Sequence, residues 1–336
     1  MASGSADTTI ILWCLKERRL THQWVAHRGA VTCLAFFPDS QKLMSGSRLD
    51  PGITIWDVSL PQGVQKILVL KCFDSSPEAC AWSPARSDRE SLVACAFPRN
   101  GRTFRIWDVH TLQLRTTFRH AGGNVCFLTF SPDGRWLATD GGYGSCSVWD
   151  ITTGRLHTVL QDAGITIYTV VFDPSGKRIA TTSGRGSNAM VQIWDVEAGM
   201  RILSFGNGSH GPLGPGLNVT FSPDGRTVLS MDDRPTIWNA ATGEAIRAFH
   251  GPGCMDMVYC LCLSPEGRYV AATSYDGIVK LWRVRDGACV ATLSGHCPSV
   301  AVYVGFSSGA ETVFYTCNDG TVYMYQLLDV VHSRAP

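Results

Sequence analysis

The side chains best able to do chemistry in this sequence are its thirteen cysteines. Cysteines that bind zinc or exchange disulfides usually occur as C-x-x-C pairs, and the sequence contains no such pair. Most lie inside apolar runs, as Cys33 does in VTCLAFF and as Cys260 and Cys262 do in VYCLCLS. A free cysteine packs as a small hydrophobic residue. We therefore expect buried free thiols in a reducing compartment, rather than a disulfide framework or a metal site.

Motifs that would indicate catalysis are also missing from the sequence. It has no G-x-S-x-G elbow, no G-x-x-x-x-G-K-[ST] loop and no H-E-x-x-H pair. The glycine-rich stretch 206–216 contains two prolines and leads into no predicted helix, so it cannot form a phosphate site at a helix N-terminus. We predict no catalytic residue, cofactor or metal, and we expect no small-molecule substrate.

The composition narrows the choice of partner and compartment. The formal net charge is +1, which gives no electrostatic reason to expect binding to nucleic acid. No apolar run reaches the ~18–20 residues that span a membrane, and no basic-then-apolar signal segment opens the chain. We expect a protein of the cytoplasm, the nucleus or both.

A regular repeat supplies the elements that must position any site. Short strand-like runs end in tryptophan, with spacings of 43, 51, 42, 45, 44, 44 and 43 residues. These runs end at Trp13, Trp56, Trp107, Trp149, Trp194, Trp238, Trp282 and, with tyrosine at this position, Tyr325. Each period also holds turns such as SPDG and TTG and three further strand-like runs. Four antiparallel strands per period, repeated in series, predict a β-propeller.

The same residues resemble the WD-repeat (WD40) family, although no particular member is identified. The resemblance rests on the Trp-Asp pairs at 56–57, 107–108, 149–150 and 194–195, on the Gly-His pair at 295–296 and on the SPDG turns. It covers nearly the whole chain and implies an all-β propeller with four antiparallel strands per blade. Because this scaffold hosts many unrelated partners, the resemblance implies little about function.

The resemblance also implies a buried hydrogen-bond network that joins His, Ser or Thr, Asp and Trp within a well-formed repeat. In the first full repeat the matching residues include Ser45 or Ser47, and the sixth and last repeats match in part. The predicted members are His27, Asp50 and Trp56, then His250, Asp276 and Trp282, then His296, Thr316 and Asp319. The middle repeats lack the His or the Asp, so we expect them to depend more on packing.

Partner binding is expected on the rim that carries the turns between second and third strands. Arg and Tyr often supply the binding energy of protein interfaces. The candidates of these two types are Arg48, Arg99, Arg102, Tyr143, Arg185, Arg234 and Tyr275. We predict a non-catalytic scaffold that binds a peptide or protein partner.

Three other functions are weaker alternatives. A substrate receptor of a ubiquitin ligase would be favoured by W-D-x-R after a third strand, and no run matches it fully. An enzyme using the central channel would need acids on the inner strands, which are apolar. Nucleic-acid binding through a basic rim is disfavoured by the near-neutral charge.

The two ends leave the blade count open. Residues 1–25 form three-quarters of a blade, which lacks a first strand, and the last unit has three strands. We favour seven blades, in which strand 19–25 joins the C-terminal strands in one closing blade. The alternative is eight blades, one incomplete, in which 327–331 adds a strand. We predict a single propeller domain over 1–331 with a tail at 332–336, and a chain that is a truncated version of something longer.

Overall fold

The computed structural model describes residues 1–37, 40–60, 63–71, 77, 79–84, 92–97, 103–109, 111, 113–119, 127–140, 145–161, 166–185, 188–206, 219–231, 234–250, 258–293 and 300–332. The chain divides into two compact units, Met1–Gly176 and Lys177–Pro336. Within the described residues the secondary structure is thirty strands and one short helix.

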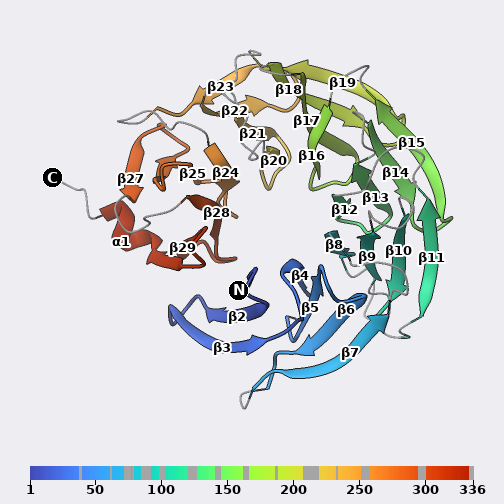
Figure 1. Cartoon of the computed structure of the whole chain (residues 1–336). Helices are drawn as coiled ribbons and strands as arrows, with labels where there is room; N and C mark the ends of the chain where they lie inside the picture. The colour runs from blue at the N-terminus through green and yellow to red at the C-terminus, as the bar shows by residue number, and fades with distance from the viewer. Residues whose placement is uncertain are drawn as a thin grey trace. The chain divides into compact units, whose positions relative to one another are not determined.

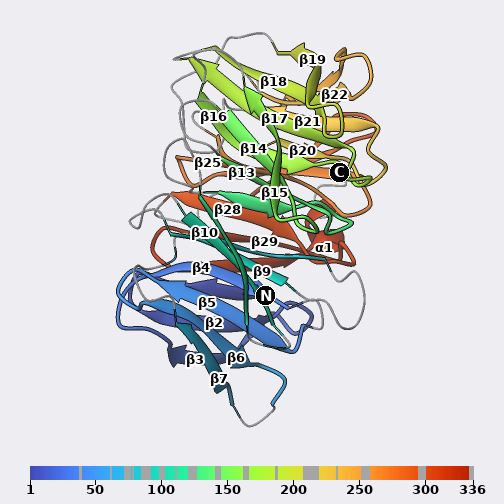
Figure 2. The same cartoon turned by 90° about the vertical axis from the view of Figure 1, so that its right-hand side faces the viewer.

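The first unit contains four sheets and one further strand. The first sheet has three strands, β1 (Ala2–Gly4), β2 (Thr9–Cys14) and β3 (Arg19–Val25). The second consists of β4 (Val31–Phe36), β5 (Lys42–Ser47), β6 (Gly52–Asp57) and β7 (Gln65–Lys71), drawn in blue in Figures 1 and 2. The third consists of β8 (Ala79–Trp82), β9 (Leu92–Phe97), β10 (Thr103–Asp108) and β11 (Leu114–Arg119). The fourth consists of β12 (Leu128–Phe130), β13 (Trp136–Asp140), β14 (Ser145–Asp150) and β15 (Arg155–Gln161), and β16 (Thr166–Phe172) follows.

The second unit begins with β17 (Arg178–Arg185), β18 (Asn188–Asp195) and β19 (Met200–Phe205), and the fifth sheet has the order β16-β17-β18-β19. The sixth sheet consists of β20 (Val219–Phe221), β21 (Thr227–Met231), β22 (Pro235–Asn239) and β23 (Ala245–Ala248). The seventh consists of β24 (Val258–Leu263), β25 (Tyr269–Ser274), β26 (Val279–Arg283) and β27 (Cys289–Leu293). The eighth has three strands, β28 (Ala301–Phe306), β29 (Thr312–Cys317) and β30 (Val322–Gln326), and α1 (Leu327–His332) follows.

The SPDG turns form tight hairpins for an identifiable reason. In the fourth sheet, Ser131 Oγ donates to Asp133 Oδ1 at 2.5 Å and accepts the backbone N–H of Trp136 at 2.9 Å. Gly134 takes a φ of 68°, a left-handed conformation that glycine adopts without a steric penalty. Local side-chain bonds and one glycine therefore fix the turn, as the sequence predicts.

A β-bulge marks every repeat tryptophan. In seven sheets the pairing of the third strand with the fourth shifts register immediately before the tryptophan, as between Ile55 and Trp56. A bulge places an extra residue in one strand and increases the local twist. This irregularity is not visible in the sequence pattern.

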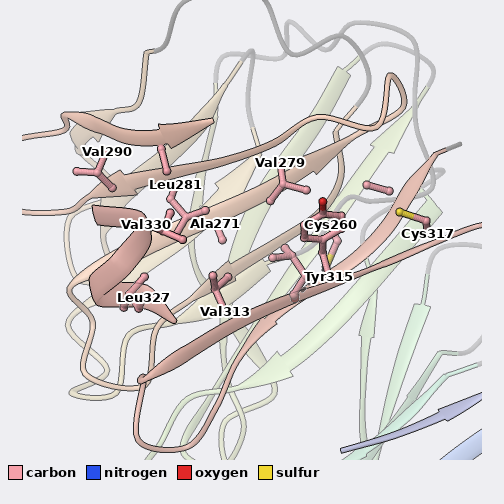
Figure 3. Close-up of a cluster of buried hydrophobic side chains, with 13 residues drawn as sticks. Cys260, Ala271, Val279, Leu281, Val290, Val313, Tyr315, Cys317, Leu327 and Val330 are labelled. Atoms are coloured by element: carbon pink, nitrogen blue, oxygen red, sulfur yellow. Dashed lines mark hydrogen bonds between the residues drawn. The ribbon is translucent and has the colours of Figure 1, made fainter. Parts of the chain in front are cut away.

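One cluster of buried residues in the second unit comes from the last two sheets and α1. Figure 3 shows Leu327 and Val330 of α1 beside strand residues of this cluster, which include Val290, Val313 and Tyr315. The two helix residues are three positions apart, so they project from the same helical face. The apolar residues after β30 therefore belong to a buried helix and not to a strand.

The sheet order shows that the predicted count of seven blades is not correct. There are eight sheets, so the fold class is an all-β propeller with eight blades, six of them four-stranded. Seven blades is wrong, because β1–β3 and β28–β30 form separate sheets and do not share a closing blade. Residues 327–331 do not add a strand either, because α1 occupies them. The single domain over 1–331 and the tail at 332–336 stay predictions.

The cysteines agree with expectation except at one position. Eight of them in the described residues form no disulfide: Cys14, Cys33, Cys80, Cys95, Cys146, Cys260, Cys262 and Cys289. Cys317, at the end of β29, is disulfide-bonded. The expectation that the thiols are uniformly free is therefore wrong at Cys317, because sequence spacing alone does not reveal which cysteines approach each other.

Candidate functional site

A buried chain of hydrogen bonds joins two strands of the second sheet, β5 and β6, to the turn between them and to the segment after β3. Trp56 Nε1 donates to Ser45 Oγ at 2.7 Å, and Ser45 Oγ lies 2.6 Å from His27 Nε2. His27 Nδ1 lies 2.7 Å from Asp50 Oδ2, and the His27 side chain is fully buried. The structure thus brings together the four residue types expected in this repeat, with Ser45 rather than Ser47 as the hydroxyl. Its role in stabilising the repeat stays a prediction.

The arrangement fits a neutral histidine. A proton on Nδ1 is donated to Asp50, and Nε2 accepts the hydroxyl hydrogen of Ser45, whose oxygen accepts from Trp56. A second proton on Nε2 would leave the Ser45 hydroxyl hydrogen without its acceptor. Burial lowers the pKa of His27, and this effect exceeds the opposing effect of the Asp50 hydrogen bond.

The network also shapes the turn between β5 and β6. Asp50 Oδ2 accepts the backbone N–H of Arg28 at 3.2 Å, which ties the turn to the segment after β3. A Cβ on Gly29 would lie 2.6 Å from Leu49 Cγ, so a larger residue here would force the Leu49 side chain to shift. Arg48 is exposed and Leu49 is 68% exposed. The turn therefore presents one cation and one large apolar side chain to solvent.

The second unit presents a different set of side chains at the corresponding turns. Arg234, in the turn between β21 and β22, is exposed, and its Nη1 lies 2.5 Å from His250 Nδ1. Tyr275, in the turn between β25 and β26, is 55% exposed and stacks on Tyr259 with 6.2 Å between ring centroids. These turns therefore present a cation and an aromatic ring, and the second ring lies in strand β24; arginine and tyrosine are common at protein interfaces.

The remaining candidates for partner binding are placed less fully. Arg185 is the last residue of β17. Arg99, Arg102 and Tyr143 lie outside the described residues. The roles of all seven candidates in partner binding stay predictions. The sequence did not predict Arg28, Leu49 or Tyr259, because no motif marks them. The exposure of Arg28 and Leu49 depends on how the turns fold, and Tyr259 matters only because Tyr275 stacks on it.

The sixth repeat does not form the histidine network as expected. Trp282 Nε1 donates to the backbone carbonyl of His250 at 2.7 Å, while the His250 ring contacts Arg234. Asp276 accepts instead from Ser274 and from the backbone of Ile278, within its own turn.

The strand register explains this difference. The residue that matches Ser45 lies two positions after the residue opposite the tryptophan. In the seventh sheet this position is Ala272, which has no hydroxyl to join the ring to the indole.

The last repeat and the middle repeats complete the comparison. His296 lies outside the described residues, Thr316 lies in β29, and Asp319 accepts from Thr321 in the following turn. The middle repeats retain part of the network, because an indole still donates to a hydroxyl of the second strand. These bonds join Trp149 to Thr139 at 3.2 Å, Trp194 to Thr181 at 3.0 Å and Trp238 to Ser230 at 2.9 Å.

Buried thiols form the other chemically distinctive group. Cys80 and Cys95 are opposite each other in β8 and β9, and a hydrogen bond with Cys33 and burial raise the pKa of the Cys80 thiol. Burial likewise raises the pKa of the Cys262 thiol. These thiols are poor nucleophiles at neutral pH, because the reactive thiolate is scarce. The described part of the chain holds no group of three or more His, Cys, Asp or Glu side chains arranged to bind a metal.

None of the helices in the described ranges is long and apolar enough to cross a membrane.

Tryptophan-terminated third strands, SPDG hairpins and eight antiparallel sheets together define a WD40-type propeller. The sequence model of the family described as "WD domain, G-beta repeat" matches residues 18–57, 112–150, 154–195, 243–283 and 287–326, which is more than half of the chain. The chain therefore belongs to the WD40 repeat family.

Similar proteins of Arabidopsis thaliana include three with different names. THO complex subunit 3 is 24% identical over 290 residues, which cover 86% of this chain and 72% of that protein. The WD repeat-containing protein 26 homolog is 24% identical, over 84% of this chain but only 46% of its own length. Guanine nucleotide-binding protein subunit beta is 27% identical over 84% of this chain and 66% of its own length. The chain thus spans less than half of one of these relatives.

A solved structure also resembles this one. The crystal structure of the computationally designed Ika8 protein has a TM-score of 0.78 and 22% sequence identity, covering 97% of this chain and 92% of that one. At this identity the likeness supports the fold alone.

Proposed function

We propose that this chain is a non-catalytic interaction scaffold that binds a peptide or protein partner through the turns between second and third strands. The single observation that carries the proposal is the exposed Arg48–Leu49 pair on the β5–β6 turn, held in place by the buried His27 network. Because the hydrogen bond between Asp50 and the backbone N–H of Arg28 holds the turn, less backbone conformational entropy is lost when a partner binds to it. The exposed Tyr275 and Arg234 support the same proposal in the second unit.

The relatives support an assembly role in general terms. Two of them are named as subunits, one of the THO complex and one of a guanine nucleotide-binding protein. Members of this family generally act as scaffolds rather than catalysts. We propose the same for this chain, in the cytoplasm, the nucleus or both, without assigning it the partners of either relative.

Affinity purification with mass spectrometry tests the proposal. Tagged wild-type chain is compared with the Arg48→Ala, Arg234→Ala and Tyr275→Ala variants, after circular dichroism has shown that each is folded. Arg155→Ala is the matched control, because Arg155 is exposed on the outer strand β15, away from these turns. We expect at least one turn variant to lose a partner that the control retains.

Two results would contradict the proposal. One is recovery of no protein beyond the tag-only background. The other is equal recovery by all three turn variants and the control. Recovery of cullin-type ligase subunits would instead favour the alternative of a ubiquitin-ligase substrate receptor.

A further inference from the structure

A pocket of about 660 Å³ lies in the first unit, beside the His27 network. Its walls are the end of β3 and the segment after it, the β5–β6 turn, and strands β6 and β7. The volume lies within the range of roughly 300–1,000 Å³ that is usual for ligand pockets. Because the pocket has both charged and apolar walls, it can bind a ligand that carries a charged group next to an apolar group.

The charged groups of the pocket are unbalanced. Its carboxylate, Asp50, is already bound by the His27 ring and by the backbone N–H of Arg28. The side chains of Arg28 and Lys66 are both exposed, and within the described ranges no carboxylate lies at ion-pair distance from either cation. Among the described residues these two positive charges have no carboxylate partner, so the carboxylate of a ligand could pair with them.

The position of Lys66 is restrained by a contact. Its Nζ lies 5.9 Å from the centroid of the Trp56 ring, an interaction that holds the ammonium group near the aromatic face. Burial is the main cause of the lowered pKa of His27, and the charge of Lys66 lowers it further. The ammonium group of Lys66 therefore lies near Trp56 and His27 and contributes positive charge to the pocket.

The apolar part of the lining is equally distinctive. Val25, at the end of β3, is 73% exposed, and Pro51 and Val69 extend the same lining. Most of the apolar surface of Val25 is therefore in contact with water in the free chain. A ligand that covers it would gain roughly 25 cal/mol for each Å² of apolar surface buried.

We propose that this pocket binds an acidic peptide segment, in which an Asp or Glu carboxylate meets Lys66 and Arg28 while a neighbouring aliphatic side chain covers Val25 and Val69. The inference rests on the proposed scaffold function and names the chemistry of the partner. A peptide fits better than a nucleic acid, because two cations beside valine and proline do not form the extended basic surface that a phosphate backbone requires.

Selection from a random heptapeptide library displayed on phage tests the inference without assuming a sequence. The full chain is the target, and the Lys66→Gln/Arg28→Gln double variant is used to remove peptides that bind elsewhere. We expect the remaining peptides to be enriched in Asp or Glu next to Leu, Ile or Val. Absence of this enrichment would overturn the inference.

Fluorescence anisotropy of one selected peptide then assigns the contacts. Loss of one charge contact at a partly exposed site weakens binding by about tenfold, so we expect this for Lys66→Gln and for Arg28→Gln. Lys66→Arg should restore binding, and the peptide with Gln in place of Glu should bind poorly. Lys16→Gln is the matched control, because it removes the same charge from the exposed β2–β3 turn.

Two further outcomes separate this inference from the proposed function. Equal binding by Lys66→Gln and wild type, or full displacement of the peptide by a single-stranded oligonucleotide, would overturn the acidic-peptide site. If Arg48→Ala loses the cellular partner while Lys66→Gln retains it, the scaffold function stands and the pocket inference fails. If acidic peptides bind but no cellular partner is recovered, the pocket inference stands and the scaffold proposal fails.

Discussion

Replacing Ser45 by alanine removes the hydroxyl that joins Trp56 to His27 and tests the energetic value of the whole network. Two buried groups would lose their partner, the indole N–H and the His27 Nε2 atom, at present 2.7 and 2.6 Å from Ser45 Oγ. An orphaned buried polar group costs about 1–3 kcal/mol, so we expect a loss of about 3 kcal/mol in the stability of the second sheet.

Ser230→Ala is the matched control for this change. Ser230 is equally buried and accepts from Trp238 at 2.9 Å, but no histidine is joined to it. Only one group would be orphaned, so the expected loss is about 1.5 kcal/mol. The same side chain is truncated on the same strand of both repeats, so differences in strand propensity cancel.

Hydrogen exchange with mass spectrometry measures the free energy of opening separately for peptides of β4–β7 and of β20–β23. This separation matters because a repeat protein does not unfold in a single two-state step. Equal losses at the two positions would refute the reasoning, because the histidine and aspartate would then add nothing to the tryptophan–serine bond.

Three further predictions concern single positions. The pKa of His27 is lowered below its usual 6.5, so the unfolded chain takes up the proton at a higher pH than the folded chain does. The opening free energy of β4–β7 should therefore reach its maximum above pH ~6.5 and decrease as the pH drops below it. Hydrogen exchange across this range measures the change, which should be smaller in His27→Gln. Gly46→Ala should destabilise the same sheet by about 1–3 kcal/mol, because its Cβ would lie 2.7 Å from Cys33 Sγ. An unchanged opening free energy of β4–β7 by hydrogen exchange would contradict this. Cys80 should alkylate with iodoacetamide at pH 8 at least about tenfold more slowly in the native chain than in urea, because burial and a raised pKa suppress its thiolate, and equal rates would count against this.

The features that the sequence predicted well are those decided by neighbouring residues. The SPDG hairpins depend on a serine, an aspartate and a glycine within five residues, and the third strands depend on a periodic apolar run ending in tryptophan. The His27 network could be anticipated for a related reason, because each member occupies a fixed place in a repeating unit.

The failures arise where a long-range partner decides the outcome. The bulge before each tryptophan depends on how the fourth strand pairs, and the residue types of the third strand do not encode it. The role of His250 depended on Ala272, which matches Ser45 only once the register is known. Lys66 and Arg28 were not predicted as binding residues, because their sequence context is that of ordinary surface residues. Lys66 lies on an outer strand and Arg28 follows an outer strand, and only the folded structure places a pocket beside them.

The blade count shows the same limit in its sharpest form. Strand 19–25 could pair either with residues 9–14 or with strands nearly three hundred residues away, and both pairings satisfy the same alternating pattern. The near pairing closes a loop of four residues, whereas the distant one must overcome a far larger loss of chain entropy. The structure adopts the near pairing, from Thr9 opposite Val25 to Cys14 opposite Arg19. After β30, Leu327 and Val330 lie buried on one face of α1, so this segment is held by helix packing and does not extend the last sheet. Local pairing at one end and a helix at the other therefore favour eight separate sheets over seven with a shared one.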